Sequence, residues 1–466
     1  MTRLTRRQFH QSVLGAAAAA TLPTLAYTAP MILHAREGSA RLAPPEYPET
    51  RIWGYEGVVP GPVLRARQGE RMTQLFRNEL PQASSVHWHG IRIENGMDGV
   101  AGMTQPAVEP GADFLYDFAL PDAGTYWYHP HNRTYEQIAR GLYGALIVEE
   151  NEGAPDVDLD EVLLIDDWRL TDDAQIAEGF GNMHDWAHAG RIGNWITVNG
   201  DGSWSHEVQR HTRMRLRLVN TANARIFTLE ARGLEGWVVA LDGMPLEAPQ
   251  PLGELTLAPA QRADLIVDVA ADEGEEAVLV SFERDGGYAI AAFPVVGAAR
   301  QARLSAPDAL PPNPVLPLGP LETAARTELR MEGGAMGGMR GAMMGGHMMG
   351  GQMMGMRDMA AAGKVWAFNG MADMGDTPLL EAALGETVRI AMINDTAWPH
   401  GMHLHGHHFR QIGADGTAGP LRDTVLMNRG ETVEIAFVAD NPGDWLLHCH
   451  MLEHSAGGMM TWLRVT

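Results

Sequence analysis

Apolar and polar residues alternate along much of the chain, which is the pattern of strands with one buried face. Two examples are "RMRLRLVN" at 213–220 and "TVRIAMIN" at 387–394, and both are predicted to be half-buried strands. Turn clusters such as "PDAGTY", "DGTAGP" and "NPGDW" separate these runs, and helical periodicity is scarce. The pattern predicts an all-β protein built from antiparallel sandwiches.

An internal repeat divides the chain. Three stretches each open with Trp, pass through Gly-rich turn residues and end in an alternating strand closed by Asn. They run from Trp53 to Asn78, from Trp195 to Asn220 and from Trp366 to Asn394. A period of roughly 140–170 residues is too long for a solenoid and implies duplicated domains. We predict domains at 40–150, 156–298 and 315–466, with a Pro-rich linker at 306–320.

The first 29 residues are predicted to be a targeting segment. Arg6 and Arg7 precede an apolar run from about Ser12 to Ala29, which resembles a twin-arginine (Tat) signal. This predicts export by the Tat machinery and a periplasmic location, with a membrane anchor as the alternative. No other segment resembles a membrane span, so no stable membrane insertion is expected.

Charge excludes two classes of partner. The formal net charge is −23, with 35 basic against 58 acidic residues. Nucleic acids and anionic membranes both require a basic surface, so we expect neither as a partner.

Cys449 is the only cysteine, so an internal disulfide is impossible. Its thiol is either an inert part of the core or takes part in the chemistry of the protein. It lies within "HCH" between His448 and His450, with His454 and Met459 following. A thiolate, two imidazoles and a distant thioether form the ligand set of a trigonal copper with a weak axial Met. Cys449 is therefore a candidate copper ligand.

Ten of the nineteen histidines fall into four groups near the two ends of the chain. Each of the four groups contains one H-x-H pair, namely His87/His89, His129/His131, His403/His405 and His448/His450. In a strand, residues i and i+2 point to the same face, so each pair offers two imidazoles together. Eight imidazoles exceed the need of one metal and imply several. Cys449 would face the opposite side and, with His400, His454 and Met459, bind a separate copper.

The four motifs, their order and their placement resemble the multicopper oxidases, which include laccases and bacterial cuprous oxidases. The resemblance implies three cupredoxin-like Greek-key β-sandwich domains and four coppers. It assigns His400, Cys449 and His454 to type 1 copper with Met459 axial, and His87 and His403 to type 2 copper. It assigns the type 3 pair to His89, His129, His131, His405, His448 and His450. The trinuclear cluster would then lie between the first and third domains, with the middle domain as a spacer.

Several other polar residues have two interpretations. Asp98 lies where family members carry an acid near the trinuclear cluster, so it could relay protons to O2 or be an ordinary turn residue. Glu453 is a weaker case. His184 and His188 are spaced i, i+4 but lack a third ligand, which favours a structural or exposed pair. His407 and His408 are expected to support the ligands or to face solvent.

Residues 331–359 contain eleven methionines interleaved with ten glycines. Thioethers are soft ligands that select Cu(I), and the segment resembles the Met-rich insertion of bacterial cuprous oxidases. The alternative is a low-complexity linker. Relatives with a defined substrate-copper site place Met and Asp just before the first type 1 His, whereas this chain has Asp395 and Trp398 and no Met there. Sulfur would have to come from the Met-rich segment, or from Met371 and Met374.

These observations together predict a periplasmic multicopper oxidase. Substrate electrons would enter at type 1 copper, pass through Cys449 to His448 and His450, and reduce O2 to water. Cu(I) is the expected reductant, with copper detoxification as the role. The alternatives are a laccase-like phenol oxidase and a copper-binding scaffold on the same fold. The sequence does not predict the oligomeric state.

Overall fold

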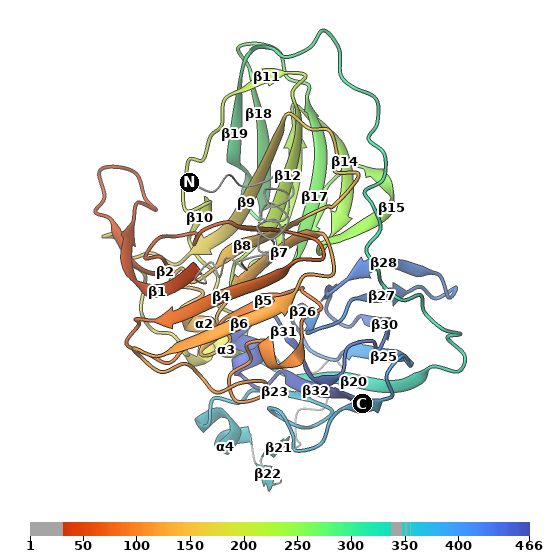
Figure 1. Cartoon of the computed structure of the whole chain (residues 1–466). Helices are drawn as coiled ribbons and strands as arrows, with labels where there is room; N and C mark the ends of the chain where they lie inside the picture. The colour runs from red at the N-terminus through yellow and green to blue at the C-terminus, as the bar shows by residue number, and fades with distance from the viewer. Residues whose placement is uncertain (1–30, 337–346, 350–351, 355) are drawn as a thin grey trace, which may run out of the picture. The chain divides into compact units, whose positions relative to one another are not determined.

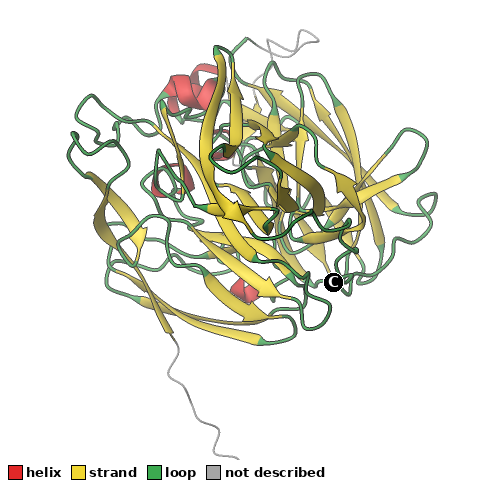
Figure 2. Cartoon of the chain, turned by 90° about the horizontal axis from the view of Figure 1, so that it is seen from above, coloured by secondary structure: helices red, strands yellow, loops and turns green. Residues whose placement is uncertain are grey.

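The computed structural model describes residues 31–336, 347–349, 352–354 and 356–466. The expected signal peptide and part of the Met-rich segment lie outside these residues. Within them, strands dominate and the few helices are short (Figures 1 and 2). Six sheets of four or more strands form three successive pairs along the described chain. The prediction of an all-β fold with three β-sandwiches is confirmed.

The first pair of sheets has strand orders β2-β1-β4-β6 and β3-β8-β7-β5. Because neighbours in space are often not neighbours in sequence, the strands cross between sheets as in a Greek key. The elements are β1 (Met31–Ala40), β2 (Thr50–Tyr55), β3 (Leu64–Arg67), β4 (Arg71–Asn78), β5 (His87–His89), η1 (Asn95–Met97), β6 (Asp113–Ala119), β7 (Gly124–His129), α2 (Thr134–Gln137) and β8 (Gly144–Glu149).

The second pair has orders β10-β9-β12-β17-β14-β15 and β11-β19-β18-β13-β16. Its elements are β9 (Leu159–Trp168), α3 (Met183–Ala187), β10 (Trp195–Val198), β11 (Val208–Arg210), β12 (Arg213–Asn220), β13 (Phe227–Arg232), β14 (Leu234–Leu241), β15 (Met244–Pro251), β16 (Leu255–Leu257), β17 (Arg262–Val269), β18 (Glu276–Glu283) and β19 (Gly286–Ala298).

The third pair has orders β23-β20-β25-β30-β27-β28 and β24-β32-β31-β26-β29, and β21 and β22 form a separate hairpin. Its elements are β20 (Ala325–Gly333), β21 (His347–Met349), β22 (Gln352–Met354), α4 (Met356–Ala361), β23 (Trp366–Phe368), β24 (Leu380–Ala382), β25 (Thr387–Asn394), β26 (His400–Leu404), β27 (Phe409–Ile412), β28 (Ala418–Arg422), β29 (Thr424–Met427), β30 (Thr432–Val438), β31 (Gly443–Cys449), α5 (Leu452–Ala456) and β32 (Met460–Val465). The three domain boundaries remain predictions.

The three repeat asparagines have the same structural role. Each ends a strand (β4, β12 or β25), and its side-chain oxygen accepts a hydrogen bond from the backbone N–H two residues later. Each amide nitrogen donates to backbone carbonyls of the following loop and of a more distant one. Asn side chains stabilise such turns by replacing backbone partners. In the first and third domains this turn leads into the histidine-bearing strand.

Strand β12 departs from the sequence prediction, because both of its faces are buried. Its three arginines form ion pairs with carboxylates: Arg213 with Asp268, Arg215 with Asp264 and Glu150, and Arg217 with Asp160 and Asp264. Buried charges require such partners. Alternation identified the strand, but it could not reveal that its polar face is covered.

The core joins the first and third sandwiches. Buried side chains of both belong to one hydrophobic cluster, with Trp88 on β5 and Met402 and Leu404 on β26. The red-orange strands of the first sandwich and the blue strands of the third lie side by side (Figure 1). The middle sandwich has its own core around Leu216 and Phe293. The histidine-bearing strands therefore lie where two sandwiches meet.

Candidate metal centre

Eight buried or nearly buried imidazoles come from the ends of four strands. We call them the eight-histidine set: His87, His89, His129, His131, His403, His405, His448 and His450. Strand register brings them together, since His87 pairs with His129 across β5 and β7, and His403 with His448 across β26 and β31. Seven of the eight are buried and His131 is half-buried.

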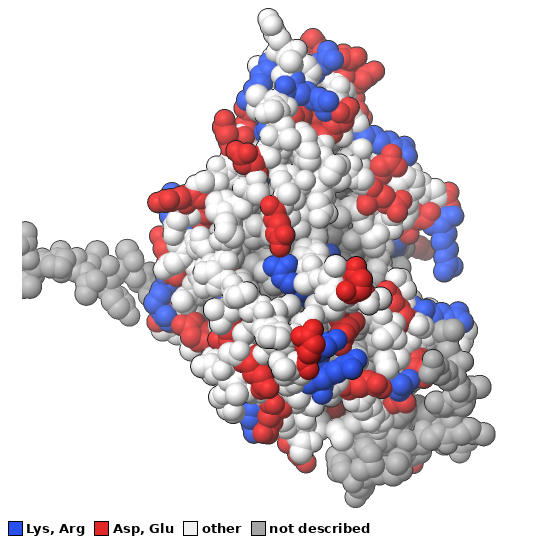
Figure 3. All heavy atoms as spheres, turned by 90° about the vertical axis from the view of Figure 1, so that its right-hand side faces the viewer, with Lys and Arg blue, Asp and Glu red and all other residues white. Residues whose placement is uncertain are grey.

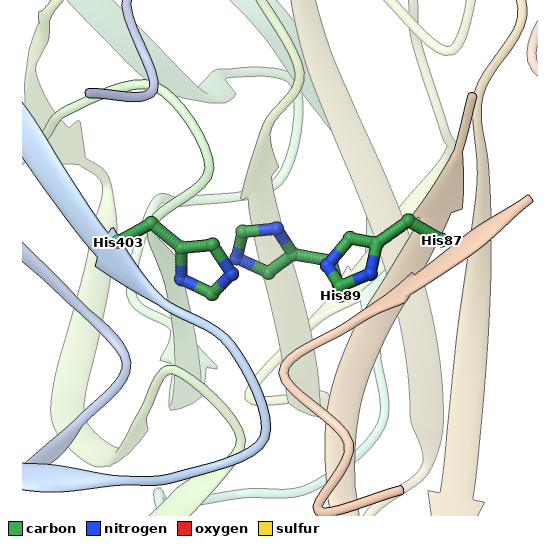
Figure 4. Close-up of side chains that lie close together, drawn as sticks. All are labelled: His87, His89 and His403. Atoms are coloured by element: carbon green, nitrogen blue, oxygen red, sulfur yellow. The ribbon is translucent and has the colours of Figure 1, made fainter. Parts of the chain in front are cut away.

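The two halves of this set meet ring against ring. His89 stacks on His403 with ring centroids 3.8 Å apart, and His87 stacks on His405 at 4.0 Å. Figure 4 shows His87 and His89 on one side facing His403 from the other. Pairs from the first and third domains therefore form one cluster.

Nitrogen positions within the cluster suit metal ions. Three groups each have ligand atoms within 4.8 Å of one another: His87, His89 and His403; His89, His129 and His450; and His131, His405 and His448. The Nε2 atoms of His405 and His448 lie 3.1 Å apart, and His129 Nε2 lies 3.4 Å from His89 Nδ1. Ligand nitrogens lie about 2 Å from a metal, so two on one ion are about 3–4 Å apart.

The ring hydrogen bonds leave nitrogens free for metal. The Nδ1 atoms of His87, His403 and His448 lie 2.7–2.9 Å from the carbonyls of Asp98, Asp423 and Cys449, so each is expected to donate there. The Nε2 atoms of His87, His131, His403 and His450 are buried without a partner among the described residues. A ligand histidine binds the metal with one nitrogen and donates through the other, so the cluster fits copper.

Asp98 lies inside the cluster. Its carboxylate is 2.9 Å from His405 Nδ1 and 3.2 Å from His87 Nδ1, and the residue is 1% exposed. It therefore contacts one histidine from each domain. Asp98 is therefore not a solvent-facing turn residue.

Asp423 is a second buried acid, which the sequence did not reveal. Its Oδ1 lies 3.4 Å from His89 Nε2 and 3.6 Å from His403 Nδ1, and Arg262 of the middle domain binds both carboxylate oxygens at 2.8 and 2.6 Å. Burial alone would raise the pKa of Asp423, but the Arg262 guanidinium, followed by His89 and His403, holds it well below its usual value. An Asp before a strand and an Arg some 160 residues away give no sequence signal.

The neighbouring pair His407 and His408 is also buried, so the solvent-facing interpretation was wrong. His408 Nε2 lies 3.7 Å from Asp423 Oδ2, and the His407 ring packs against Phe437 and Trp445. His408 therefore belongs to the surroundings of Asp423.

A second group lies on the other face of β31. We call His400, Cys449 and His454 the cysteine set. Cys449 Sγ is 3.6 Å from His400 Nδ1 and 3.8 Å from His454 Nδ1, and the two nitrogens are 3.0 Å apart. All three residues are 0% exposed. A thiolate and two imidazoles at these separations fit a trigonal copper.

Backbone bonds bring Met459 next to this set. The Cys449 N–H donates to the Met459 carbonyl at 3.1 Å, the Met459 N–H donates to the His454 carbonyl at 3.0 Å, and Met459 is 0% exposed. The fourth predicted residue is therefore buried beside the other three.

The protonation states also favour metal binding by neutral imidazoles. Burial lowers the pKa of His400 well below its ordinary value, and His454 lowers it further. Burial likewise lowers the pKa of His131 to about 3 and that of His454 to about 4. Burial raises the pKa of Cys449 to about 12, so its proton must leave when a metal binds.

The middle domain contributes contacts as well as spacing. Besides Arg262, its Asn223 Nδ2 donates to Glu453 Oε1 at 2.9 Å, and the carbonyl of His188 lies 2.7 Å from His454 Nε2. Burial raises the pKa of Glu453 to about 7, and Asn223 opposes that rise. The expected spacer therefore touches the surroundings of both sets.

Comparisons with known proteins agree with this geometry. Three multicopper oxidase domain profiles match residues 38–153, 160–293 and 350–466. The chain is similar to the multicopper oxidase MmcO of Mycobacterium tuberculosis, with 30% identity over 443 residues covering 87% of this chain and 82% of that protein. It is also similar to copper resistance protein A of Pseudomonas syringae pv. tomato, with 25% identity over 548 residues covering 88% of each. The crystal structure of Lac15 from a marine microbial metagenome matches with a TM-score of 0.76 and 44% identity, covering 94% of this chain and 100% of that one.

Proposed function

Because the chain belongs to the multicopper oxidases, copper-dependent oxidoreductases that use O2 and a reductant, we propose that its reductant is Cu(I) and its role copper detoxification. The observation that carries the electron-transfer part of the proposal is the placement of Cys449 between two ligand sets. Its thiol lies among His400 and His454, while the residues on either side of it, His448 and His450, lie in the eight-histidine set.

The proposed copper content is four ions. His400, Cys449 and His454 would hold the type 1 ion with Met459 axial, and His87 and His403 would hold the type 2 ion. The type 3 pair would be held by His89, His129, His131, His405, His448 and His450. When bound, copper accepts single electrons and supplies them to O2.

The residues position, insulate and connect these sites. Cys449 and His448 are adjacent, so a single peptide unit joins the two ligand sets. His400, Cys449 and His454 are 0% exposed, so bulk water does not reach the cysteine set. Asp98 lies against His87 and His405, so its carboxylate can hold a proton beside the larger cluster, where the reduction of O2 consumes protons.

Two features support Cu(I) as the reductant. The Met-rich segment at 331–359 offers soft thioethers within the predicted third domain. A relative of which the chain covers 88% is named copper resistance protein A. A laccase-like phenol oxidase is the second candidate, favoured by Trp398 in place of a Met just before His400.

Deletion of residues 337–355, which leaves β20 (Ala325–Gly333) and α4 (Met356–Ala361) in place, tests the choice between these substrates. The deletion should lower kcat/KM for Cu(I) at least about tenfold and leave oxidation of a dimethoxyphenol within about twofold, because only Cu(I) needs sulfur ligands. Replacement of the segment by a Gly/Ser linker of equal length controls for chain connectivity. Equal losses on both substrates, or no loss, would contradict the Cu(I) role.

The proposed location is the periplasm after Tat export. Among the described residues, no helix has the length and apolar character that crossing a membrane requires. On the face drawn in Figure 3, acidic and basic side chains are interspersed, and no extended basic surface for nucleic acid is present there.

A further inference from the structure

Two histidines of the middle domain lie beside the cysteine set without belonging to it. His184 is on α3 and His188 follows its last turn, and their rings are parallel, with planes 10° apart and centroids 4.4 Å apart. We call them the α3 histidine pair. The His184 side chain is 79% exposed and His188 is half-buried. Two imidazoles at i, i+4 on a helix can share one metal ion.

The ring nitrogens of this pair are available to a ligand. His188 Nδ1 lies 3.0 Å from the His184 carbonyl, and His184 Nδ1 lies 3.8 Å from an Asp185 oxygen. Among the described residues, neither Nε2 atom has a hydrogen-bond partner. Asp185 is itself held by Arg169 through two contacts of 2.7 and 3.1 Å, so its charge is already paired.

The pair is connected directly to the cysteine set. His454 Nε2 is expected to donate to the His188 carbonyl, 2.7 Å away. The His188 ring packs edge-on against Trp398 at 5.4 Å, and Trp366 packs against His454 at 4.4 Å. One hydrogen bond therefore separates the backbone of the pair from an imidazole of the set.

The start of the Met-rich segment packs against the end of α3. The Ala335 N–H donates to the Ala187 carbonyl at 2.6 Å, and Trp398 Nε1 donates to the Ala335 carbonyl at 3.1 Å. Met336, the next residue, is 71% exposed, and Met183 of α3 is 42% exposed. Two exposed methionines are therefore close to the pair along the backbone: Met183 precedes His184, and Met336 follows the residue that bonds Ala187.

Helix α3 also covers the edge of the cysteine set. His400, Cys449 and His454 are 0% exposed, and the outward nitrogen of His454 is already engaged by the His188 carbonyl. A reductant cannot touch the set directly, so its electron must cross the covering residues. The α3 histidine pair is among these covering residues.

We infer that the α3 histidine pair binds the substrate copper ion and that His188 passes its electron to His454. This inference rests on the proposed function, because it names the docking site for Cu(I). One bound Cu(I) would lose one electron and leave as Cu(II), and the copper that the cysteine set would hold would gain that electron. Four such events deliver the four electrons that, with four protons, convert one O2 to two waters.

The double variant His184→Ala/His188→Ala tests the site. His206→Ala is the matched control, because His206 is a partly exposed middle-domain histidine that packs against Trp204 and lies 3.4 Å from Glu161. Binding is measured by titrating the copper-loaded proteins with Ag(I), a redox-inert substitute for Cu(I). Turnover is measured with Cu(I) and, separately, with hexacyanoferrate(II), an outer-sphere donor that needs no metal ligand.

The double variant should bind one Ag(I) fewer per chain and lose at least tenfold in kcat/KM for Cu(I). Its blue absorption and its rate with hexacyanoferrate(II) should match those of the control. Unchanged Ag(I) binding, unchanged Cu(I) oxidation, or an equal loss on both reductants would overturn the site. If the wild type oxidises hexacyanoferrate(II) but not Cu(I), the proposed substrate fails, and the Ag(I) count still decides whether the pair binds a soft metal.

Discussion

The cysteine set and the eight-histidine set differ in how much of the fold each one needs. The cysteine set lies within residues 400–454 of one domain, and the middle domain adds one hydrogen bond, from His454 to the His188 carbonyl. The eight-histidine set is divided between residues 87–131 and 403–450 and exists only where two domains dock. Local strand geometry therefore suffices for the first set, whereas the second also depends on interdomain packing.

The largest difference between the sets should follow from Cys449→Ser. The variant removes the thiolate, and with it the connection between the sets, but leaves every imidazole of the larger set in place. Blue colour should disappear and oxidation should fall by more than the roughly 10- to 100-fold typical of losing a residue that only supports a ligand. Absorbance and steady-state rates measure this. A blue, active variant would contradict the assignment.

Asp98→Asn should affect the larger set alone. The amide keeps the shape of the side chain next to His87 and His405 but cannot carry a proton as the carboxylic acid does. We expect kcat to fall about 100-fold, within the usual range for general acid–base groups. Anaerobic reduction of the blue site should keep its wild-type rate. If that reduction slows equally, Asp98 acts on the fold rather than on proton transfer.

Asp423→Asn tests the support that the middle domain gives to the larger set. Arg262 would lose the carboxylate that binds two of its nitrogens and keep only Asp242, 3.9 Å away, which should lower the free energy of unfolding by about 3 kcal/mol. Retention of type 2 copper, followed by electron paramagnetic resonance, should weaken about 10- to 100-fold. Asp113→Asn is the matched control, because its ion pair with Arg77 is exposed, and stability should not change. Equal effects of the two variants would show that Asp423 has no special role.

Acidification should destabilise the copper-free protein. The pKa values of His131 and His454 are about 3 and about 4 in the folded chain, against roughly 6.5 for unfolded histidine. Below about pH 6.5 the unfolded chain binds protons that the folded chain does not, so stability falls by about 1.4 kcal/mol per pH unit for each histidine. Denaturant unfolding at pH 7.5, 6.5 and 5.5 measures this. A flat profile between pH 6.5 and 5.5 would contradict the burial of neutral imidazoles.

The sequence predicted those features that depend on short-range geometry. Alternation identified the strands, and the i, i+2 rule placed His448 and His450 on the face opposite Cys449. Features that depend on docking were harder to predict. The burial of the arginines of β12, the contact of Asp423 with Arg262, and the position of His188 over His454 each join residues distant in sequence, so no local pattern indicated them.

Copper content and colour of the purified, copper-loaded protein test most directly whether two distinct ligand sets exist. Two separate sets predict about four copper ions per chain and the intense blue absorption of a thiolate-bound copper. A protein that holds its full copper yet is colourless would contradict the assignment of Cys449 to copper.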